Sequence, residues 1–393
     1  MRLPPNVRAL GFVSFLTDAS SEMIYPLLPL FLSSVLKAGP AFLGLIEGIA
    51  EATASLAKLA SGVLSDAVGK RKPLVVGGYC LSTLSRPLIA IAQSPFHVLL
   101  IRFSDRIGKG VRGAPRDALI VDTCPQELRG RAFGFQRAMD HLGAVLGPLM
   151  AYAALRMLHL ELRSVFALAA VPGILAVLVI VYGVRERSAA ATVSRMSLRW
   201  SGIPRVYKYY LFVIVVFTLS NSSDAFILLR ARDVGFSESG VLLLWTLLHV
   251  VKAVSSMVGG TLSDRLGRKA LIVAGWIAYA LAYLGFGVAA VPYQVIALFA
   301  FYGLYFGCTE GAERALVADL VPQPELRGRA YGLYHFVVGI SALPSSLLMG
   351  VLYGRFGAPT AFGCGAALSL LSMLMLLPVR VDRIVHASSS PTR

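Results

Sequence analysis

Long apolar segments recur along the chain and are separated by short polar ones. No charged residue occurs from Ala270 to Pro292, from Ala361 to Val379 or from Val165 to Tyr182. A helix needs about 20 apolar residues to cross a hydrocarbon layer of about 30 Å. A single segment of this kind fits a buried helix of a soluble protein, but several along one chain do not. The segments also lack the alternation of membrane β-strands, so we expect membrane-spanning helices.

The pattern predicts twelve spans with polar connections between them. They cover residues 8–33, 40–65, 73–92, 98–121, 132–155, 164–183, 209–228, 238–262, 270–289, 294–320, 330–354 and 360–378. An even number of spans places both termini on one side, and the segments on that side hold 21 Lys and Arg residues against 6 on the other. Because basic residues stay on the cytoplasmic side, we expect a multi-pass protein of the plasma (inner) membrane with cytoplasmic termini.

Composition agrees with a membrane protein. Hydrophobic residues make up 56% of the 393 residues and charged residues only 15%, against about 25% charged residues in soluble domains. The net charge of +16 follows from the topology, and no basic or aromatic pattern for nucleic acid accompanies it, so we expect no nucleic-acid partner. The sequence has no nucleotide-binding loop, catalytic triad or metal-ligand spacing. We therefore predict a protein that is not an enzyme and holds no cofactor or metal.

The two halves of the sequence repeat. The segment from Gly62 to Arg71 returns from Gly260 to Lys269, and the segment 127–134 returns at 325–332 with the same separation. Six spans lie between equivalent points, so the repeats run parallel and are related by an axis along the membrane normal. We predict an all-α membrane protein of two six-helix bundles related by a pseudo-twofold axis, at residues 1–183 and 208–378, with a cytoplasmic linker at 184–207 and a tail at 379–393.

The repeated loop carries the pattern G-x-x-x-D-R-x-G-R-R/K, with Ala67 in place of the arginine in its first copy. In this motif, and over nearly its whole length, the chain resembles transporters of the major facilitator superfamily (MFS). The resemblance implies a secondary transporter whose loop aspartates dock on the opposite bundle and lock a cytoplasmic gate. The gate residues are then Asp66, Gly69, Lys70, Arg71, Asp264, Arg265, Gly267 and Arg268. Glycine permits the tight turn of such a loop; a simple basic anchor is the alternative interpretation.

The fifth span contains a second pattern of small residues. Gly134, Gly143, Gly147 and Pro148 are similar to the motif of MFS antiporters, with Met150 and Ala151 where that motif has two glycines. The resemblance implies antiport. Close packing of helices through small residues explains the same spacing without antiport.

Two carboxyl groups lie inside the first span. Asp18 and Glu22 are four residues apart, so they share one helix face, and ionisable residues inside a membrane are costly and usually functional. Two neighbouring carboxyl groups in a medium of low dielectric resist losing both protons. We predict that Asp18 and Glu22 carry protons; static pairing with cations of the fourth span is the alternative.

The fourth span is rich in cations and resembles the MFS pattern R-x-x-Q-G-x-G-A-A from Arg106 onward, with Lys109 replacing the glutamine and Arg112 a glycine. The resemblance gives Arg106 a role in proton transfer. At a rise of 1.5 Å per residue, Asp18 and Glu22 lie at the depth of Lys109 and Arg106, and we expect the four to form a cluster. The residues predicted to line a substrate cavity are Lys109, Arg112, Asn221, Asp224 and Glu310. The cations indicate an anionic or zwitterionic substrate unless nearby acids neutralise them.

Charged pairs at equivalent positions of the two halves predict an inner gate. Arg116 and Asp117 in the fourth span correspond to Glu313 and Arg314 in the tenth, in reversed order of charge. We predict that Arg116–Glu313 and Asp117–Arg314 pair across the bundles when the transporter faces outward. Pairing within each half is the alternative.

Together these features predict a secondary active transporter that works by alternating access. We expect proton-coupled efflux of a small organic solute or drug by a monomer in the lipid bilayer. A proton symporter that takes up an organic anion is one alternative, and a receptor or lipid flippase on the same fold is another.

Overall fold

The computed structural model describes residues 3–68, 70–125, 128–186, 202–321 and 323–379, which are almost entirely helical and form no strand. The elements of the first half are α1 (Pro5–Ile24), η1 (Tyr25–Leu27), α2 (Leu28–Leu30), η2 (Phe31–Val35), α3 (Pro40–Val68), α4 (Lys72–Ser85), η3 (Arg86–Ile91), α5 (Pro95–Thr123), α6 (Arg129–Arg156), α7 (Leu162–Leu168) and α8 (Ala170–Gly183). Those of the second half are α9 (Arg205–Ser220), α10 (Ala225–Asp233), α11 (Glu238–Leu266), α12 (Arg268–Val288), α13 (Pro292–Leu320) and α14 (Pro324–Leu376).

These helices have the predicted layout of twelve spans in two bundles. Several spans consist of two helical pieces. The first runs from α1 to η2 and changes helix type near Pro26 and Pro29, as expected because proline removes a helical hydrogen bond. The seventh is divided between α9 and α10, and α14 comprises the last two spans, which separate at Gly357, where the backbone φ angle is 79°. Only glycine adopts such an angle without strain.

Eight helical stretches of the described chain are long and apolar enough to cross a membrane, and the longest of them contains both spans of α14. Helices α1, α3 and α5 are not among them. These three carry charged residues along their length, and all three line the central cavity described below.

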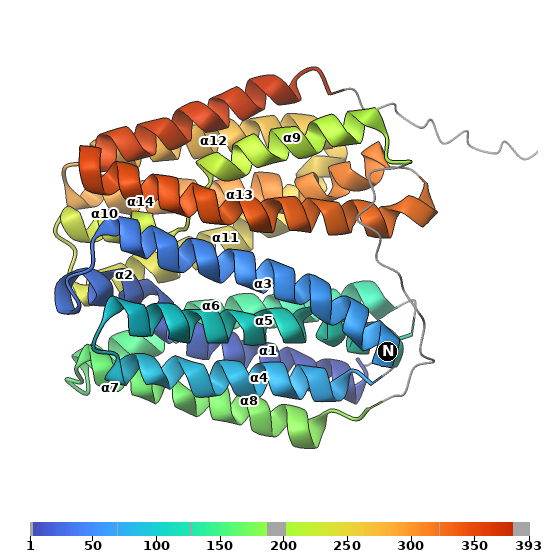
Figure 1. The fold of residues 1–393 in the computed structure, drawn as a ribbon, viewed down its shortest axis with the longest axis horizontal. Helices are drawn as coiled ribbons and strands as arrows, with labels where there is room; N and C mark the ends of the chain where they lie inside the picture. Colours follow the sequence, from blue (N-terminus) through green and yellow to red (C-terminus); the bar gives the residue numbers. More distant parts are fainter. Residues whose placement is uncertain (1–2, 69, 126–127, 187–201, 322, 380–393) are drawn as a thin grey trace, which may run out of the picture.

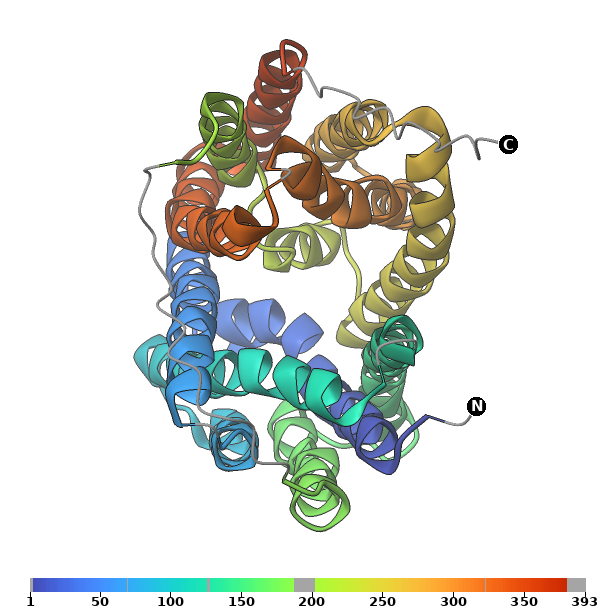
Figure 2. The same cartoon turned by 90° about the vertical axis from the view of Figure 1, so that its right-hand side faces the viewer.

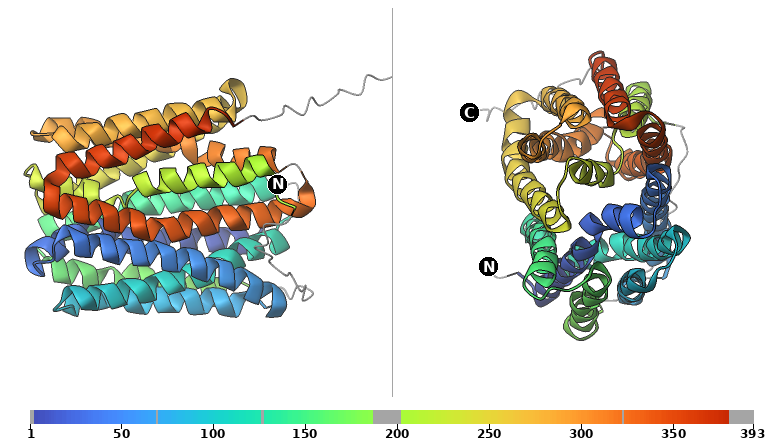
Figure 3. Two further views of the ribbon diagram at one scale, coloured as in Figure 1. Left: turned by 45° about the horizontal axis from the view of Figure 1, so that its top comes forward. Right: turned by 90° about the vertical axis from the view of Figure 1, so that its left-hand side faces the viewer.

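The two bundles lie side by side with their helices nearly parallel (Figure 1). Views along the helices show α1–α8 on one side and α9–α14 on the other, with α3 beside α14 and α6 beside α11 at the junctions (Figures 2 and 3). The approach of α3 to α14 is very close. A Cβ atom on Gly44 would lie 2.1 Å from the carbonyl oxygen of Ser346, so this contact requires glycine.

Helix α1 begins and α14 ends on one side of the molecule, which we call the terminal side (Figures 1 and 2). On the opposite side, hydrogen bonds join the bundles: Arg156 Nε donates to Ser239 Oγ (2.9 Å) and Arg232 Nη1 to the carbonyl oxygen of Leu30 (3.5 Å). The bundles are therefore closed against each other on the side opposite to the termini.

The predicted boundary after residue 183 falls at the end of a helix, whereas the predicted start of the second bundle at 208 lies three residues inside α9. Helix α8 ends at Gly183 and α9 begins at Arg205. Most of the predicted linker and tail, namely residues 187–201 and 380–393, lies outside the described residues.

Candidate functional site

A cavity of about 660 Å³ lies between the two bundles. Helices α1, α3, α5 and α6 form its first-bundle wall, and the start of α10 together with α11, α13 and α14 forms the second-bundle wall. This volume is within the range of about 300–1,000 Å³ that is usual for small-molecule sites. Most of its lining side chains are charged or aromatic.

Two arginines, one of η3 and one of α5, are neutralised by carboxylates within the first bundle. Arg86 Nε lies 2.9 Å from Asp105 Oδ1, and Arg102 Nη2 lies 2.7 Å from Glu47 Oε1. All four side chains are buried. Removal of one partner of a buried ion pair strongly destabilises a protein, so these pairs hold α3, η3 and α5 against one another.

Arg106 also pairs within the first bundle. Its Nη2 lies 3.5 Å from Glu51 Oε1 of α3, and no hydrogen bond or ion pair among the described residues joins it to Asp18 or Glu22. All four residues of the predicted cluster line this cavity. Arg106, however, pairs with Glu51 and not with Asp18 or Glu22.

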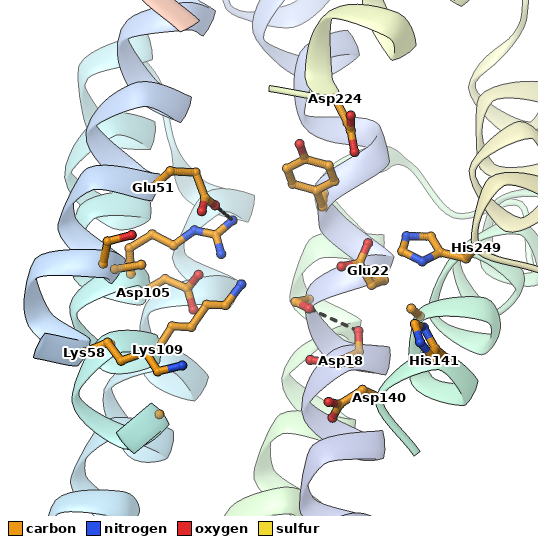
Figure 4. A pocket seen from close by; sticks show the side chains of 18 of the residues that line it. Asp18, Glu22, Glu51, Lys58, Asp105, Lys109, Asp140, His141, Asp224 and His249 are labelled. Carbon is orange, nitrogen blue, oxygen red and sulfur yellow. Dashed lines mark hydrogen bonds and ion pairs between the residues drawn. The ribbon is translucent and has the colours of Figure 1, made fainter. Parts of the chain in front are cut away.

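Asp18 and Glu22 project into the cavity from α1, as Figure 4 shows. In the described part of the chain, no Lys, Arg or His nitrogen lies within 4.0 Å of either carboxylate. Glu22 Oε2 accepts a hydrogen bond from Trp245 Nε1 of α11 (2.7 Å). This bond crosses between the bundles, so one of the two predicted proton carriers contacts the opposite bundle directly.

Two glycines of the antiporter-like motif hold α1 against α6. A Cβ atom on Gly143 would lie 2.4 Å from the carbonyl oxygen of Phe15, and one on Gly147 would lie 2.6 Å from that of Ala19. Pro148 lies within α6, and Gly134 has nothing within 4 Å of the position of a Cβ. Gly143 and Gly147 thus act in packing and set the positions of the carboxylates on α1.

The opposite wall of the cavity carries lysines. Lys58 of α3 and Lys109 of α5 extend into the space that faces α1 and α6 (Figure 4). Both are exposed within the cavity, and neither forms an ion pair with another described residue. Arg112 lines the cavity but its guanidinium lies 4.4 Å from the centre of the Tyr79 ring and donates to Ser82 Oγ (2.6 Å), which directs its charge toward α4.

The second bundle contributes Asp224, at the start of α10, and Lys252 of α11. Asp224 Oδ1 accepts a hydrogen bond from Tyr302 OH (2.7 Å), and Lys252 Nζ lies 3.8 Å from the centre of the Phe306 ring. Asn221 is not part of the cavity lining; its side chain donates to Tyr305 OH (3.2 Å).

The predicted inner-gate residues pair within their own halves in this conformation. Arg116 Nη2 lies 3.0 Å from Asp117 Oδ1. Glu313 accepts hydrogen bonds from Trp276 Nε1 (3.0 Å) and Tyr334 OH (2.9 Å). The predicted pairs Arg116–Glu313 and Asp117–Arg314 are not formed.

A different ion pair joins the bundles on the terminal side of the cavity. Arg137 of α6 pairs with Glu310 of α13, and Arg314 Nη2 lies 3.6 Å from the same carboxylate oxygen. Of the ion pairs between described residues, this is the one that crosses from bundle to bundle.

An arginine beside each repeated loop pairs with an aspartate at the end of a helix in the same bundle. Arg71 Nη1 lies 3.1 Å from Asp122 Oδ2 at the end of α5, and Arg268 pairs with Asp319 at the end of α13. Gly267 has a φ angle of 89°, which confirms the predicted tight turn, and Lys70 is exposed beside the first loop. Gly69 and the side chains of Asp66, Asp264 and Arg265 lie outside the described part of the structure, so the predicted docking of the aspartates stays a prediction.

The sequence analysis missed several residues that line or support the cavity, Lys58 among them. Glu47 and Glu51 neutralise arginines of α5, and Trp245 binds Glu22. The two glutamates carried a usable signal, because they are acidic residues inside a span and share the four-residue spacing of Asp18 and Glu22. Nothing in the local sequence distinguishes Trp245 from other aromatic residues of the spans.

Comparisons with known proteins agree with this architecture. The family model of the Major Facilitator Superfamily matches residues 10–229 and 209–392. The chain is 35% identical over 95% of both chains to an uncharacterized MFS-type transporter of Methanocaldococcus jannaschii, and 23% identical over 91% of both to the multi-drug resistance efflux pump PmrA of Streptococcus pneumoniae.

Solved structures share the fold. A crystal structure of the peptide transporter POT superposes with a TM-score of 0.79 at 15% identity, covering 95% of this chain and 94% of that one. The nucleoside transporter NupG gives 0.78 at 12% identity over 95% and 99% of the two chains. Matches of a family model across the chain and of a relative over its full length show that this protein belongs to the major facilitator superfamily and is a membrane transporter.

Proposed function

We propose that this transporter exports a small organic solute in exchange for protons. One observation carries the proposal: Asp18 and Glu22 face the central cavity without a cation in ion-pairing distance among the described residues. Carboxylates that lack a neutralising partner in a site of low dielectric bind a proton more readily than paired ones. The paired acids of the first bundle, such as Asp105 and Glu47, have no comparable reason to change charge.

The contact with Trp245 suggests how a proton would affect the two bundles. Ionised Glu22 accepts a strong, charge-assisted hydrogen bond from the indole of α11, and protonation weakens that bond. Since Trp245 belongs to the second bundle, a change of charge on Glu22 alters the free energy of one arrangement of the bundles relative to the other. Arg106 is paired with Glu51 on the facing wall of the cavity, so its charge stays fixed while Asp18 and Glu22 change theirs.

One observation favours export. The relatives of this chain include a multi-drug resistance efflux pump of Streptococcus pneumoniae and the multidrug resistance protein MdtG of Salmonella paratyphi A. The excess of Lys and Arg residues in the terminal-side segments favours cytoplasmic termini. With that orientation, the closed side of the molecule faces away from the cytoplasm, a state in which an exporter loads its solute and an importer releases it.

The test uses everted membrane vesicles in which respiration makes the lumen acidic. A panel of metabolites and drugs is added, and the pH gradient is followed with acridine orange. An exported solute that exchanges for protons dissipates the gradient, and Asp18→Asn or Glu22→Gln abolishes this response while Glu161→Gln, an exposed acid outside the cavity, leaves it intact. A solute that the protein moves without any change in the gradient would refute proton exchange. In right-side-out vesicles, a proton–anion symporter would take up protons together with the added anion and make the medium more alkaline, the opposite of the acidification that a proton exchanger would give.

We also propose that Arg116–Glu313 and Asp117–Arg314 form when the cavity closes on the terminal side. The pairing of these residues within each half belongs, on this account, to the conformation described above. Charge reversal at Arg116 should abolish transport, and exchange of the residues at positions 116 and 313 should partly restore it. Lack of rescue would argue against the gate.

A further inference from the structure

The cavity holds unpaired charges of both signs on separate walls. Lys58 and Lys109 extend from α3 and α5 and form no ion pair with another described residue. Asp18 of α1 and Asp140 of α6 face them from the other wall (Figure 4) and likewise form none within the described chain. Arg86, Arg102 and Arg106 do not add to these unpaired charges, because each pairs with a carboxylate. The guanidinium of Arg112 is directed toward Tyr79 and Ser82 of α4.

Aromatic groups line the same space. The rings of Trp245 and His249 meet edge to face with centroids 4.9 Å apart, and Phe306 lies beneath Lys252. Both nitrogens of the His249 ring are buried and lack a hydrogen-bond partner among the described residues, although the residue lines the cavity. A buried polar group without a partner is costly, so a ligand that offers it a hydrogen bond would bind favourably.

A ligand with one sign of charge suits only one of these walls. An anion pairs with the lysines and leaves Asp18 and Asp140 beside its own negative charge, and a cation does the reverse. Placing like charges side by side in a binding site costs several kcal/mol. A ligand that carries both charges satisfies the two walls together, and a volume of about 660 Å³ accommodates an organic body between its charged ends.

We propose that the substrate is a zwitterion with an aromatic or apolar body. Lys58 and Lys109 bind its acidic group, Asp18 and Asp140 bind its ammonium group, and Trp245, His249 and Phe306 contact the part between. This inference rests on the proposed transport function and specifies the substrate class of the same cavity.

The binding test compares ligands that differ only in charge. The probes are tryptophan, its cationic amide and its anionic N-acetyl derivative, together with the corresponding three forms of phenylalanyl-tryptophan, within a wider panel of zwitterionic, cationic and anionic metabolites and drugs. Thermal stabilisation of the purified full-length protein identifies binders, and calorimetry measures their affinities. We expect zwitterions to bind at least ~10-fold more tightly than matched forms that lack one charge, as the loss of one charge-assisted hydrogen bond implies.

Single substitutions test which cavity residues bind the acidic group and which bind the ammonium group of the zwitterion. Lys109→Gln should weaken binding of the zwitterion ~10-fold or more. It should leave binding of the amide unchanged, because the amide has no acidic group for Lys109 to bind. Asp140→Asn should weaken binding of the zwitterion and leave binding of the N-acetyl form unchanged. This substitution does not alter the proposed proton carrier Glu22. Lys37→Gln and Glu161→Gln, which change exposed residues outside the cavity, should alter neither.

The outcomes separate this inference from the proposed function. If the strongest binders carry charge of one sign only, or if no zwitterion in the panel binds, the substrate class is wrong. If zwitterions bind with the expected response to Lys109→Gln but never dissipate a pH gradient in vesicles, the class stands and proton exchange fails. Equal weakening of the zwitterion and its amide by Lys109→Gln would show that Lys109 supports the cavity structurally and does not bind the acidic group, which overturns the assignment.

Discussion

Alanine at Gly143 tests how α6 positions the carboxylates of α1. The added Cβ would lie 2.4 Å from the carbonyl oxygen of Phe15 and 3.1 Å from Asp18 Cβ, whereas ordinary contacts begin at 3.4 Å. The two backbones must therefore separate by about 1 Å, the difference between 3.4 and 2.4 Å. Overpacking of this kind costs ~1–3 kcal/mol, and the better helix propensity of alanine returns up to ~1 kcal/mol. The expected net loss is about 1–2 kcal/mol.

Gly134 in the same helix provides the control, because a Cβ there meets nothing within 4 Å. Gly134→Ala should leave the protein as stable as the wild type or slightly more so, and Gly143→Ala should lower both the thermal stability in detergent and the rate of transport. A displacement of about 1 Å at a reacting group can reduce a rate by about two orders of magnitude. If Gly143→Ala matches Gly134→Ala in both stability and transport, α6 does not position Asp18 in the way the structure indicates.

Two further predictions concern ion pairs. Glu47→Gln removes one partner of the buried pair with Arg102 and should lower the free energy of unfolding by ~3–5 kcal/mol, measured by thermal or denaturant unfolding; a variant as stable as the wild type would contradict this. Glu310→Gln removes the ion pair with Arg137 between the bundles. Because the pair is partly exposed, its loss should shift the equilibrium between conformations that are closed and open on the terminal side by at most ~1 kcal/mol, or about fivefold in population. The shift is measured as faster alkylation of a cysteine that replaces His335. An unchanged alkylation rate would exclude this contact as a restraint on the terminal side.

The spans and their duplication could be predicted from sequence because apolar length and repeated loops are local features. The break between α9 and α10 and the changes of helix type around Pro26 lie inside predicted spans, and the apolar pattern did not specify them. Gly267 adopts the turn that its motif predicts. These properties depend on short stretches of backbone, which one sequence describes well.

The pairing inside the cavity could not be predicted in the same way. Depth along a helix placed Arg106 beside Glu22, but the rotation of each span about its axis decides which residues meet, and spans that are apolar on most faces carry little information about rotation. Arg106 therefore pairs with Glu51. Contacts between bundles, such as Trp245 with Glu22, also depend on which state of the transport cycle is present.

The central claim is that Asp18 and Glu22 exchange protons during transport, and proteoliposomes test it most directly. A substrate identified with the panel is followed in two modes: uphill movement driven by a pH gradient, and exchange between labelled and unlabelled substrate at equal pH. At a substrate concentration that saturates the variant, which offsets the loss of Asp18 as a substrate ligand, we predict that Asp18→Asn combined with Glu22→Gln retains exchange and loses uphill movement, because substrate still crosses while the proton cannot. Uphill movement at the wild-type level by this double variant would contradict the account.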